Sequence, residues 1–151
     1  MKRIFLFLTF ALTFLFLRCA DEETIELLNE VASELDKERK ITIWYEGTFS
    51  VGPQSDKYVW GKLNAGDTLV VYVEQLQGDY IAKILLLNYY NFQRWNNYKT
   101  YRPIFSARNI TNYAKWIVPI PASDTYYFLI YNDAYMVTIK VYVKIIRIYW
   151  Q

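Results

Sequence analysis

From residue 41 onward, hydrophobic positions fall in short runs that predict strands. The runs are rich in Val, Ile, Thr, Tyr and Trp, which favour β-structure, and they cover residues 41–51, 57–63, 68–76, 80–87, 113–120, 125–132 and 136–150. Turn residues separate them, at Gly52-Pro53, Ala65-Gly66-Asp67, Gly78-Asp79, 121–124 and Asn132-Asp133. Seven or eight short strands within about 110 residues predict an all-β fold, a single antiparallel jelly-roll-like β-sandwich over residues 41–151.

The last of these runs shows the two-residue period of a half-buried strand. Five apolar residues alternate with four polar or amphipathic ones, so that Val137, Ile139, Val141, Val143 and Ile145 face one way and Thr138, Lys140, Tyr142 and Lys144 the other. We expect the first set to face the core.

A different pattern, with helical spacing, precedes the strands. In residues 20–40 the apolar positions Ile25, Leu28, Ala32 and Leu35 are spaced by three, four and three, while acids crowd the start and bases the end. This predicts a short acidic helix. We expect it to be a solvated stalk with one apolar stripe, which lies on the domain or helps to pair neighbouring molecules.

The first nineteen residues read as an export signal. Lys2 and Arg3 are followed by an uncharged run from Ile4 to Leu17 that is apolar except for Thr9 and Thr13. It is too short for a comfortable membrane span of about 20 residues and suits a secretory signal. Cys19, the sole cysteine, follows after Arg18. The segment resembles the signal of bacterial lipoproteins, whose terminal cysteine receives a diacylglyceryl group, and this implies lipidation of Cys19 and membrane attachment through the N-terminal lipid.

The residues just before Cys19 leave an alternative open. The lipoprotein pattern usually has small residues there, whereas this chain has Phe16, Leu17 and Arg18. The alternative is an uncleaved signal-anchor. Either way, we expect the body to work outside the cytoplasm, in the cell envelope.

Charge and residue types exclude most catalytic chemistry. The chain has no His, which removes the usual general base and the commonest metal ligand, and its single cysteine cannot build a Cys-rich metal site. Residues 41–151 carry about +4 and residues 20–40 carry −5, with no clustered basic footprint and no nucleic-acid-binding motif. We therefore expect no enzyme activity, no cofactor, no metal and no nucleic-acid partner.

Carboxylates are the remaining chemical candidates. Glu46, Glu74 and Asp79 could in principle form a glycosidase pair, but strand charges usually face solvent. The aspartates at turns, namely Asp67, Asp79, Asp124 and Asp133, could contribute to a Ca²⁺ site, although Asp is expected at turns for backbone reasons alone.

The positive signal for function is aromatic. Residues 41–151 hold five Trp, fifteen Tyr and four Phe, more than the interior of a sandwich about 10 Å thick accommodates. The densest stretch is 88–102, which we expect to form a long crossover with a helical turn. Rings among amide and guanidinium donors suit sugar stacking or protein recognition, and the candidate ligand-binding residues are Tyr90, Arg94, Trp95, Tyr98, Tyr101 and Arg102. The alternative is a loop whose rings plug the end of the sandwich.

Four segments carry a family resemblance. Residues 63–69 (LNAGDTL), 84–87 (ILLL), 91–95 (NFQRW) and 119–132 (PIPASDTYYFLIYN) resemble GOLD/emp24-like jelly-roll domains and are also similar to prepeptidase C-terminal β-sandwich domains. The resemblance covers nearly all of residues 48–144. It implies non-catalytic recognition or folding support.

Taken together, these patterns predict an exported, lipid-anchored, non-catalytic binding or structural module of the cell envelope, with a protein or glycan partner. The alternatives are a carbohydrate-binding module that recognises surface glycans and a subunit of a surface assembly that packs beside copies of itself.

Overall fold

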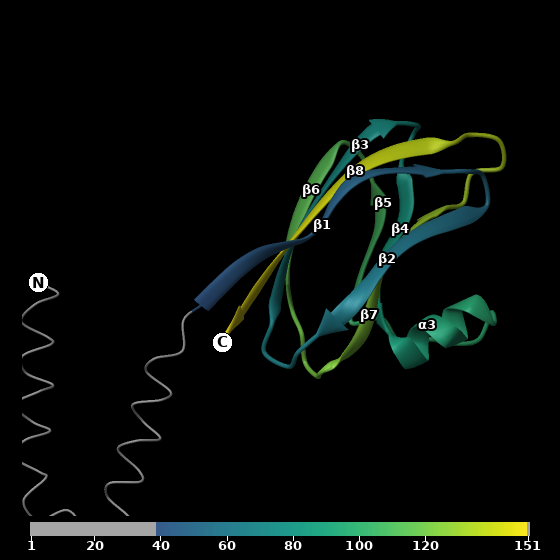
Figure 1. Cartoon of the computed structure of the whole chain (residues 1–151). Coiled ribbons are helices and arrows are strands. Elements are labelled where there is room, and N and C mark those ends of the chain that lie inside the picture. Colours follow the sequence, from purple (N-terminus) through teal and green to yellow (C-terminus); the bar gives the residue numbers. More distant parts are fainter. Residues whose placement is uncertain (1–38, 151) are drawn as a thin grey trace, which may run out of the picture. The chain divides into compact units, whose positions relative to one another are not determined.

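The computed structural model describes residues 39–150 (Figure 1). The predicted signal segment, Cys19 and residues 20–38 of the predicted helix lie outside the described residues. No helix within residues 39–150 is both long enough and apolar enough to cross a membrane.

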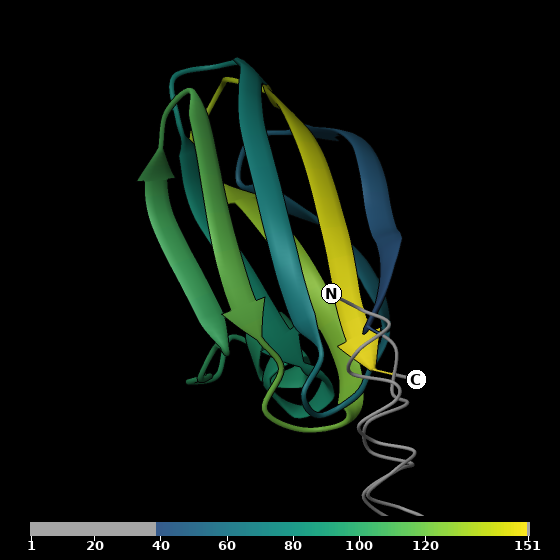
Figure 2. The same ribbon diagram turned by 90° about the vertical axis from the view of Figure 1, so that its left-hand side faces the viewer.

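The described chain forms two four-stranded antiparallel sheets. Sheet A contains, in spatial order, β1 (Arg39–Val51), β8 (Ile139–Trp150), β3 (Thr68–Gln77) and β6 (Tyr113–Pro119). Sheet B contains β2 (Ser55–Leu63), β7 (Asp124–Asn132), β4 (Ile81–Asn88) and β5 (Phe105–Ile110). Figure 2 shows β3 and β8 side by side in the front layer, with β1 and β6 flanking them.

The order of strands is that of a jelly roll. Six of the seven connections cross from one sheet to the other, and only the β4–β5 connection, which holds helix α3 (Tyr89–Asn96), stays within sheet B. Two interlocked Greek keys of this kind define the double-sheet jelly roll. The predicted fold class is therefore confirmed.

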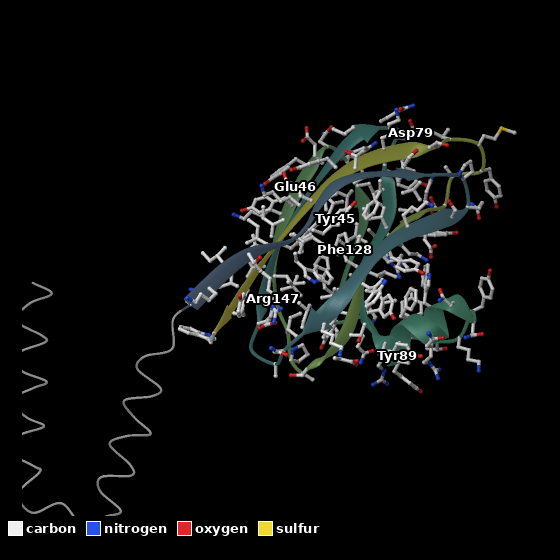
Figure 3. The ribbon with its side chains drawn as sticks, in the orientation of Figure 1. Tyr45, Glu46, Asp79, Tyr89, Phe128 and Arg147 are labelled. Carbon is white, nitrogen blue, oxygen red and sulfur yellow. The ribbon has the colours of Figure 1, made fainter. Side chains whose placement is uncertain are left out.

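The inner faces of the two sheets build the main core. In β8 the predicted alternation holds, because Ile139, Val141, Val143 and Ile145 are all buried. Val137 precedes the strand and is 41% exposed, so the alternation begins two residues later than predicted. Phe128 of β7 fills the space between the sheets (Figure 3).

One strand is missing from the sequence prediction. Strand β5 lies between residues 88–102, predicted as a crossover, and the next predicted strand at residues 113–120. Among the described strands it pairs with β4 alone and forms one edge of sheet B. Its centre, Ser106-Ala-Arg-Asn109, has no apolar run, and Asn109 has a φ of 53°. An edge strand with one polar face gives too weak a pattern to be recognised from composition.

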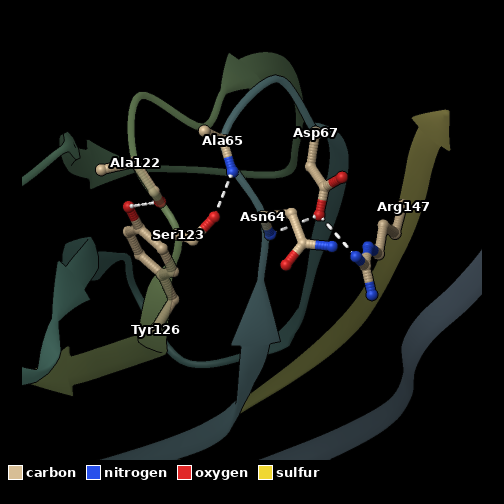
Figure 4. Close-up of polar contacts among 7 residues, drawn as sticks. All are labelled: Asn64, Ala65, Asp67, Ala122, Ser123, Tyr126 and Arg147. Carbon is tan, nitrogen blue, oxygen red and sulfur yellow. Dashed lines mark hydrogen bonds and ion pairs between the residues drawn. The ribbon is translucent and has the colours of Figure 1, made fainter.

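A buried carboxylate fixes one end of the sandwich. Asp67, in the β2–β3 turn, is only 3% exposed. Its Oδ2 accepts a hydrogen bond from the Asn64 backbone N–H at 2.8 Å and forms an ion pair with Nη2 of Arg147 in β8 at 2.7 Å (Figure 4). The turn itself needs Gly66, whose φ of 86° is left-handed. Asp67 thus joins the β2–β3 turn to β8, one of the two central strands of sheet A.

The same turn is joined to the β6–β7 turn beside it. The Ala65 backbone N–H donates to Ser123 Oγ at 2.9 Å (Figure 4). The Ile120 backbone N–H donates to the Asp67 carbonyl at 2.8 Å. Tyr126 closes the second turn by donating from its hydroxyl to the Ala122 carbonyl at 2.7 Å.

A buried amide serves the opposite end. Asn132, at the end of β7, is 1% exposed, and its Nδ2 donates to the carbonyls of Val51, Gly52 and Val137 at 3.1, 3.1 and 2.7 Å. Its Oδ1 accepts from the Ala134 N–H at 3.1 Å. One side chain therefore holds the β1–β2 and β7–β8 turns together.

Substitution of Asp67 by Asn tests the first of these ties. The change keeps the shape of the side chain but leaves the Arg147 guanidinium without its anionic partner in a largely buried position, so we expect unfolding free energy to fall by about 3 kcal/mol. Asp79→Asn, at the exposed β3–β4 turn, is the matched control and should change stability by no more than about 0.5 kcal/mol. Urea unfolding measures both. Equal effects of the two substitutions would contradict the assigned role of Asp67.

Candidate functional site

Helix α3 lies on the outer face of sheet B, where it covers a second, smaller core. Asn88 caps its start, accepting from the Asn91 backbone N–H at 3.0 Å through Oδ1. The buried residue on its inner side, Phe92, packs against outward-facing residues of β4 and β7, which are Leu85, Leu87 and Leu129. Strand β4 is therefore buried on both faces, which explains its continuous apolar run.

Aromatic rings surround Phe92. The rings of Phe92 and Tyr127 stack with centroids 3.8 Å apart and an interplanar angle of 3°. Tyr58 meets Phe92 edge-on at 4.8 Å. Tyr89, at the start of α3, also lies against Tyr127 and is 52% exposed (Figure 3). This part of the predicted aromatic segment is packed, but its rings cover the outer face of sheet B and do not plug the end of the sandwich.

The other end of α3 has an unusual residue at its terminus. Lys99 N–H donates to the Arg94 carbonyl at 2.8 Å and Tyr98 N–H to the Trp95 carbonyl at 3.0 Å, which together form a Schellman motif. The position after the C-cap in that motif is left-handed and favours Gly, yet here Tyr98 occupies it with a φ of 54°. The Tyr98 side chain is 100% exposed.

Trp95 lies beside this terminus and is held from several sides. Its Nε1 donates to Asp56 Oδ2 at 2.8 Å. Tyr101 and Tyr131 meet the indole ring edge-on, with centroid distances of 5.1 and 5.6 Å. The Lys83 ammonium lies 5.6 Å from the indole centroid. The indole is therefore fixed in orientation before any ligand arrives.

Trp95, Asp56 and Tyr131 line an open cleft of about 390 Å³ between the β1–β2 turn and the C-terminal end of α3. Its lining combines three rings with amide, hydroxyl and carboxylate groups, from Gln54, Ser55, Asp56, Trp95, Asn96, Tyr98 and Tyr131. Gln54 is itself held, because its backbone N–H donates to the Ala134 carbonyl at 3.0 Å. A few fixed polar groups beside aromatic walls form the chemistry of a small-ligand or sugar site.

The structure distributes the six predicted binding residues differently. Trp95 and Tyr98 line the cleft. Tyr101 packs behind Trp95, and burial raises the pKa of its hydroxyl.

The remaining three lie outside the cleft lining. Tyr90 and Arg94 pair with each other on α3, through a 3.1 Å hydrogen bond from Arg94 Nη1 to the tyrosine oxygen. Arg102 has an exposed side chain and donates its backbone N–H to Asn91 Oδ1 at 2.8 Å.

Five cleft residues were not predicted, namely Gln54, Ser55, Asp56, Asn96 and Tyr131. The first three follow the Gly52-Pro53 turn signal, and Asn96 belongs to the aromatic stretch. Local sequence patterns therefore identified the segments that contain these four residues, but not the residues themselves. What sequence could not give is the contact between Asp56 and Trp95, which are 39 positions apart.

An exposed aromatic strip continues from the cleft along β2. Asp56, Tyr58 and Trp60 alternate with Lys57 and Val59, so all three occupy one face of the strand. Tyr58 is 45% and Trp60 64% exposed. Trp60 lies beside Tyr127, with centroids 6.5 Å apart and an interplanar angle of 29°. Successive positions on one face lie about 7 Å apart, so the strip extends the cleft by two ring positions.

The carboxylates do not resemble a glycosidase pair. Tyr142 donates its hydroxyl to Glu46 Oε1 at 2.6 Å, and Lys144 lies 3.1 Å from Oε2. The Tyr142 bond, followed by Lys144, holds the pKa of Glu46 below its ordinary value. A general acid needs the opposite shift. Glu74 is exposed on sheet A, and Asp79 lies at the β3–β4 turn (Figure 3).

The aspartates at turns are likewise engaged elsewhere. Asp67 pairs with Arg147, Asp133 accepts from the Tyr80 hydroxyl at 2.9 Å, and Asp124 Oδ1 accepts from the next backbone N–H at 2.6 Å. Within residues 39–150, no three His, Cys, Asp or Glu side chains gather as metal ligands would.

The sequence matches no protein-family model and no curated protein. Among solved structures, a protein of the disulfide-linked pili of Bacillus endospore appendages is 10% identical, with a TM-score of 0.52, and the match covers 74% of this chain and 88% of that one. A low-affinity xylan-binding module from Roseburia intestinalis is 6% identical, with a TM-score of 0.40 over 76% and 96% of the two chains. Aeromonas hydrophila PliG, a periplasmic inhibitor of g-type lysozyme, is 13% identical, with a TM-score of 0.42 over 78% and 90%.

Likeness at these identities concerns the fold. The pilus protein shares the sandwich architecture of this chain. None of the three is described as a GOLD/emp24-like or prepeptidase C-terminal domain, and that resemblance stays a prediction.

Substitutions of Phe92 and Tyr90 compare the contribution of a buried ring of α3 to stability with that of an exposed one. Phe92→Ala removes a buried, stacked ring, and we expect it to lower the free energy of unfolding by about 3 to 5 kcal/mol. Tyr90→Ala removes a ring that is 63% exposed, and the expected loss is about 0.5 kcal/mol. Thermal and urea unfolding of the two variants measure the difference. A Phe92→Ala variant as stable as Tyr90→Ala would show that α3 does not depend on this second core.

Proposed function

We propose that this chain is a non-catalytic, exported module that binds glycan in the cleft between α3 and the β1–β2 turn. The proposal includes membrane attachment through a lipid on Cys19. It makes the predicted carbohydrate-binding alternative the preferred one and places the site at Trp95 and Tyr98, with Asp56 and Tyr131 added.

The observation that carries the proposal is Tyr98. A left-handed backbone costs a non-glycine residue about 1 kcal/mol or more, and no burial of the Tyr98 side chain offsets that cost, since it is fully exposed. Glycine would serve the helix terminus better. Contact with a ligand would explain why a bulky ring occupies this position.

The chemistry of the lining fits a sugar. Indole and phenol rings pack against the C–H face of a pyranose, while amide, hydroxyl and carboxylate groups exchange hydrogen bonds with its hydroxyls. Asp56 holds the Trp95 indole at 2.8 Å and keeps further acceptor capacity for a hydroxyl. Tyr58 and Trp60 would extend the same contact to a longer chain.

A protein partner is the second candidate. Exposed Tyr and Trp with Arg nearby also make protein recognition sites. The recessed, polar cleft favours the glycan, because protein hot spots usually lie on broader and drier surfaces.

Tyr98→Gly tests the glycan proposal and its physical basis together. We expect the variant to be at least as stable as the wild type, because Gly relieves the left-handed strain, and to bind at least about 30-fold more weakly, as loss of a hot-spot ring would cause. Affinity electrophoresis against soluble neutral polysaccharides such as xylan, mannan and β-glucan measures binding. Tyr113→Ala, an exposed ring on sheet A, is the control.

Two further results would bear on this test. Trp60→Ala should weaken binding of long chains more than of disaccharides, because Trp60 lies two ring positions beyond the cleft. Unchanged binding in Tyr98→Gly, or equal losses in Tyr98→Gly and Tyr113→Ala, would refute a site at this cleft.

The anchor is tested by mass. If Cys19 is acylated, the mature wild-type chain should begin at residue 19 and carry a diacylglyceryl adduct, and Cys19→Ser should leave the protein unprocessed or free of the membrane. Intact-mass spectrometry of membrane extracts measures this. A chain that begins at Met1 with a free thiol would mean an uncleaved signal-anchor instead.

A further inference from the structure

The outer face of sheet A is divided into an apolar half and a charged half. Residues directly opposite in antiparallel strands share a face, so the strand register defines rows across β1, β8, β3 and β6. One row is wholly aliphatic and consists of Ile43, Ile146, Val70 and Ile117. The next row toward the chain termini consists of Ile41, Ile148, Thr68 and Pro119.

These aliphatic side chains are open to solvent at the sheet edges. Ile41, Ile43 and Ile117 are 70%, 55% and 68% exposed. An outward face of an antiparallel sheet is normally polar, and contiguous exposed aliphatic surface on a single chain marks an interaction site. The apolar half of this face is therefore unexplained by the fold.

The other half of the face carries charges in a definite order. One row reads Glu46, Lys144, Tyr72, Lys115, and the next reads Thr48, Tyr142, Glu74, Tyr113. Lys144 is paired with Glu46, whereas Lys115 and Glu74 make no ion pair within residues 39–150. The Lys115 ammonium lies 5.0 Å from the Tyr72 ring centroid.

A second copy fits this face about a two-fold axis that runs along the strands, between β8 and β3. Such an axis reverses the order of each row, so Ile43 of one copy faces Ile117 of the other and Ile146 faces Val70. The aliphatic row then packs entirely on itself. Two sheets stacked with nearly aligned strands are the ordinary packing of a sandwich.

The charged rows become complementary under the same axis. Glu46 of one copy faces Lys115 of the other, so Lys115 gains a carboxylate partner. Glu74 faces Tyr142, whose hydroxyl already donates to Glu46 of its own copy. An axis perpendicular to the strands would instead place each strand on itself and would not bring Glu46 to Lys115. Charge order thus selects one symmetric arrangement.

The area is sufficient for association. Four strands about 4.8 Å apart and four rows about 6.8 Å apart cover about 500 Å² per copy, or about 1,000 Å² in total. This reaches the lower limit for a specific protein interface, about 1,000 Å². Confinement of the chain to a membrane surface would favour such an interface further.

We propose that the outer face of sheet A is a homodimer interface with the two-fold axis parallel to β8 and β3. The inference does not depend on glycan binding, because the cleft lies on sheet B. The dimer presents two clefts on its two outer surfaces.

Paired cysteines in the full-length chain test the geometry. Residues 43 and 117 of one copy are three strand spacings apart, about 14 Å, whereas across the interface they face each other at the sheet separation of about 10 Å. The shortest bismaleimide spans the second distance but not the first. Membranes that contain the double variant Ile43→Cys/Ile117→Cys should give a covalent dimer, and either single variant and the wild type, which all retain Cys19, should not.

Charge exchange tests the same contact by sedimentation equilibrium of the full chain in mild detergent. Lys115→Glu should weaken association about 10-fold, and adding Glu46→Lys should restore it to within about 3-fold. Ile117→Lys should weaken it at least about 30-fold, since an ammonium would be buried against aliphatic groups. Met136→Lys, on the exposed β7–β8 turn, is the control and should have no effect.

Several outcomes would overturn the proposal. A monomeric wild type with no cross-linked dimer in membranes would do so, as would single cysteine variants that cross-link as readily as the double. If the chain is monomeric and Ile117→Lys releases it from vesicles of phosphatidylglycerol and phosphatidylethanolamine, the face contacts lipid instead. Glycan binding by the monomer would leave the function proposed for the cleft intact.

Discussion

Two buried polar side chains, Asp67 and Asn132, hold the crossings between the sheets on which the jelly roll depends. Each time the chain leaves one sheet for the other, backbone N–H and C=O groups lose their ladder partners and need others. Asp67 supplies them at one end of the sandwich and Asn132 at the other. Between these ends the buried residues are apolar, so burial stabilises the sandwich without specifying how its turns sit. The hydrogen bonds of Asp67 and Asn132 fix the positions of the turns.

The asymmetry between the two sheets follows from what covers their outer faces. Helix α3 lies on sheet B, and β4 is consequently apolar on both sides. The helix can hold Trp95 and Tyr98 at the cleft because Phe92 is fixed against Tyr127 and Leu129 beneath it. A rigid support for exposed rings reduces the entropy lost when a ligand binds. Sheet A has no such cover among the described residues, and its aliphatic row remains open.

Much of this fold could be predicted from the sequence, because it rests on local patterns. Alternation in residues 139–145 gave the core face of β8, and turn residues bounded most strands to within a few positions. The strand order could not be predicted, since it depends on pairings such as Arg39 with Trp150, at opposite ends of the body. Strand β5 was missed because its single neighbour leaves it largely polar.

The candidate site was predictable in part, and for the same reason. The aromatic stretch identified Trp95 and Tyr98, but the division of its rings between packing and exposure depends on the helix that forms there. Both Trp95 and Tyr101 are aromatic residues of the same stretch, so the sequence does not distinguish their roles. The structure shows that Trp95 lines the cleft and that Tyr101 packs behind it. The left-handed backbone at Tyr98 belongs to the Schellman motif. That motif is usually recognised in a sequence by a glycine, and this chain has none at the position.

The pairing of β1 with β8 sets the order in which the body can fold. Strand β1 is the first part of the body to leave the ribosome or a translocation pore, and its only neighbour in sheet A is the last strand of the chain. Strand β1 therefore has no partner in sheet A until β8 has emerged, and β2 likewise waits for β7. These two strands therefore pair late, whereas β4 can pair with β5, and β3 with β6, before β7 and β8 are available. Pairings between strands so far apart in sequence slow folding. Late pairing of β1 and β2 would keep this part of the chain extended while the rest emerges, which would suit the export proposed for the protein.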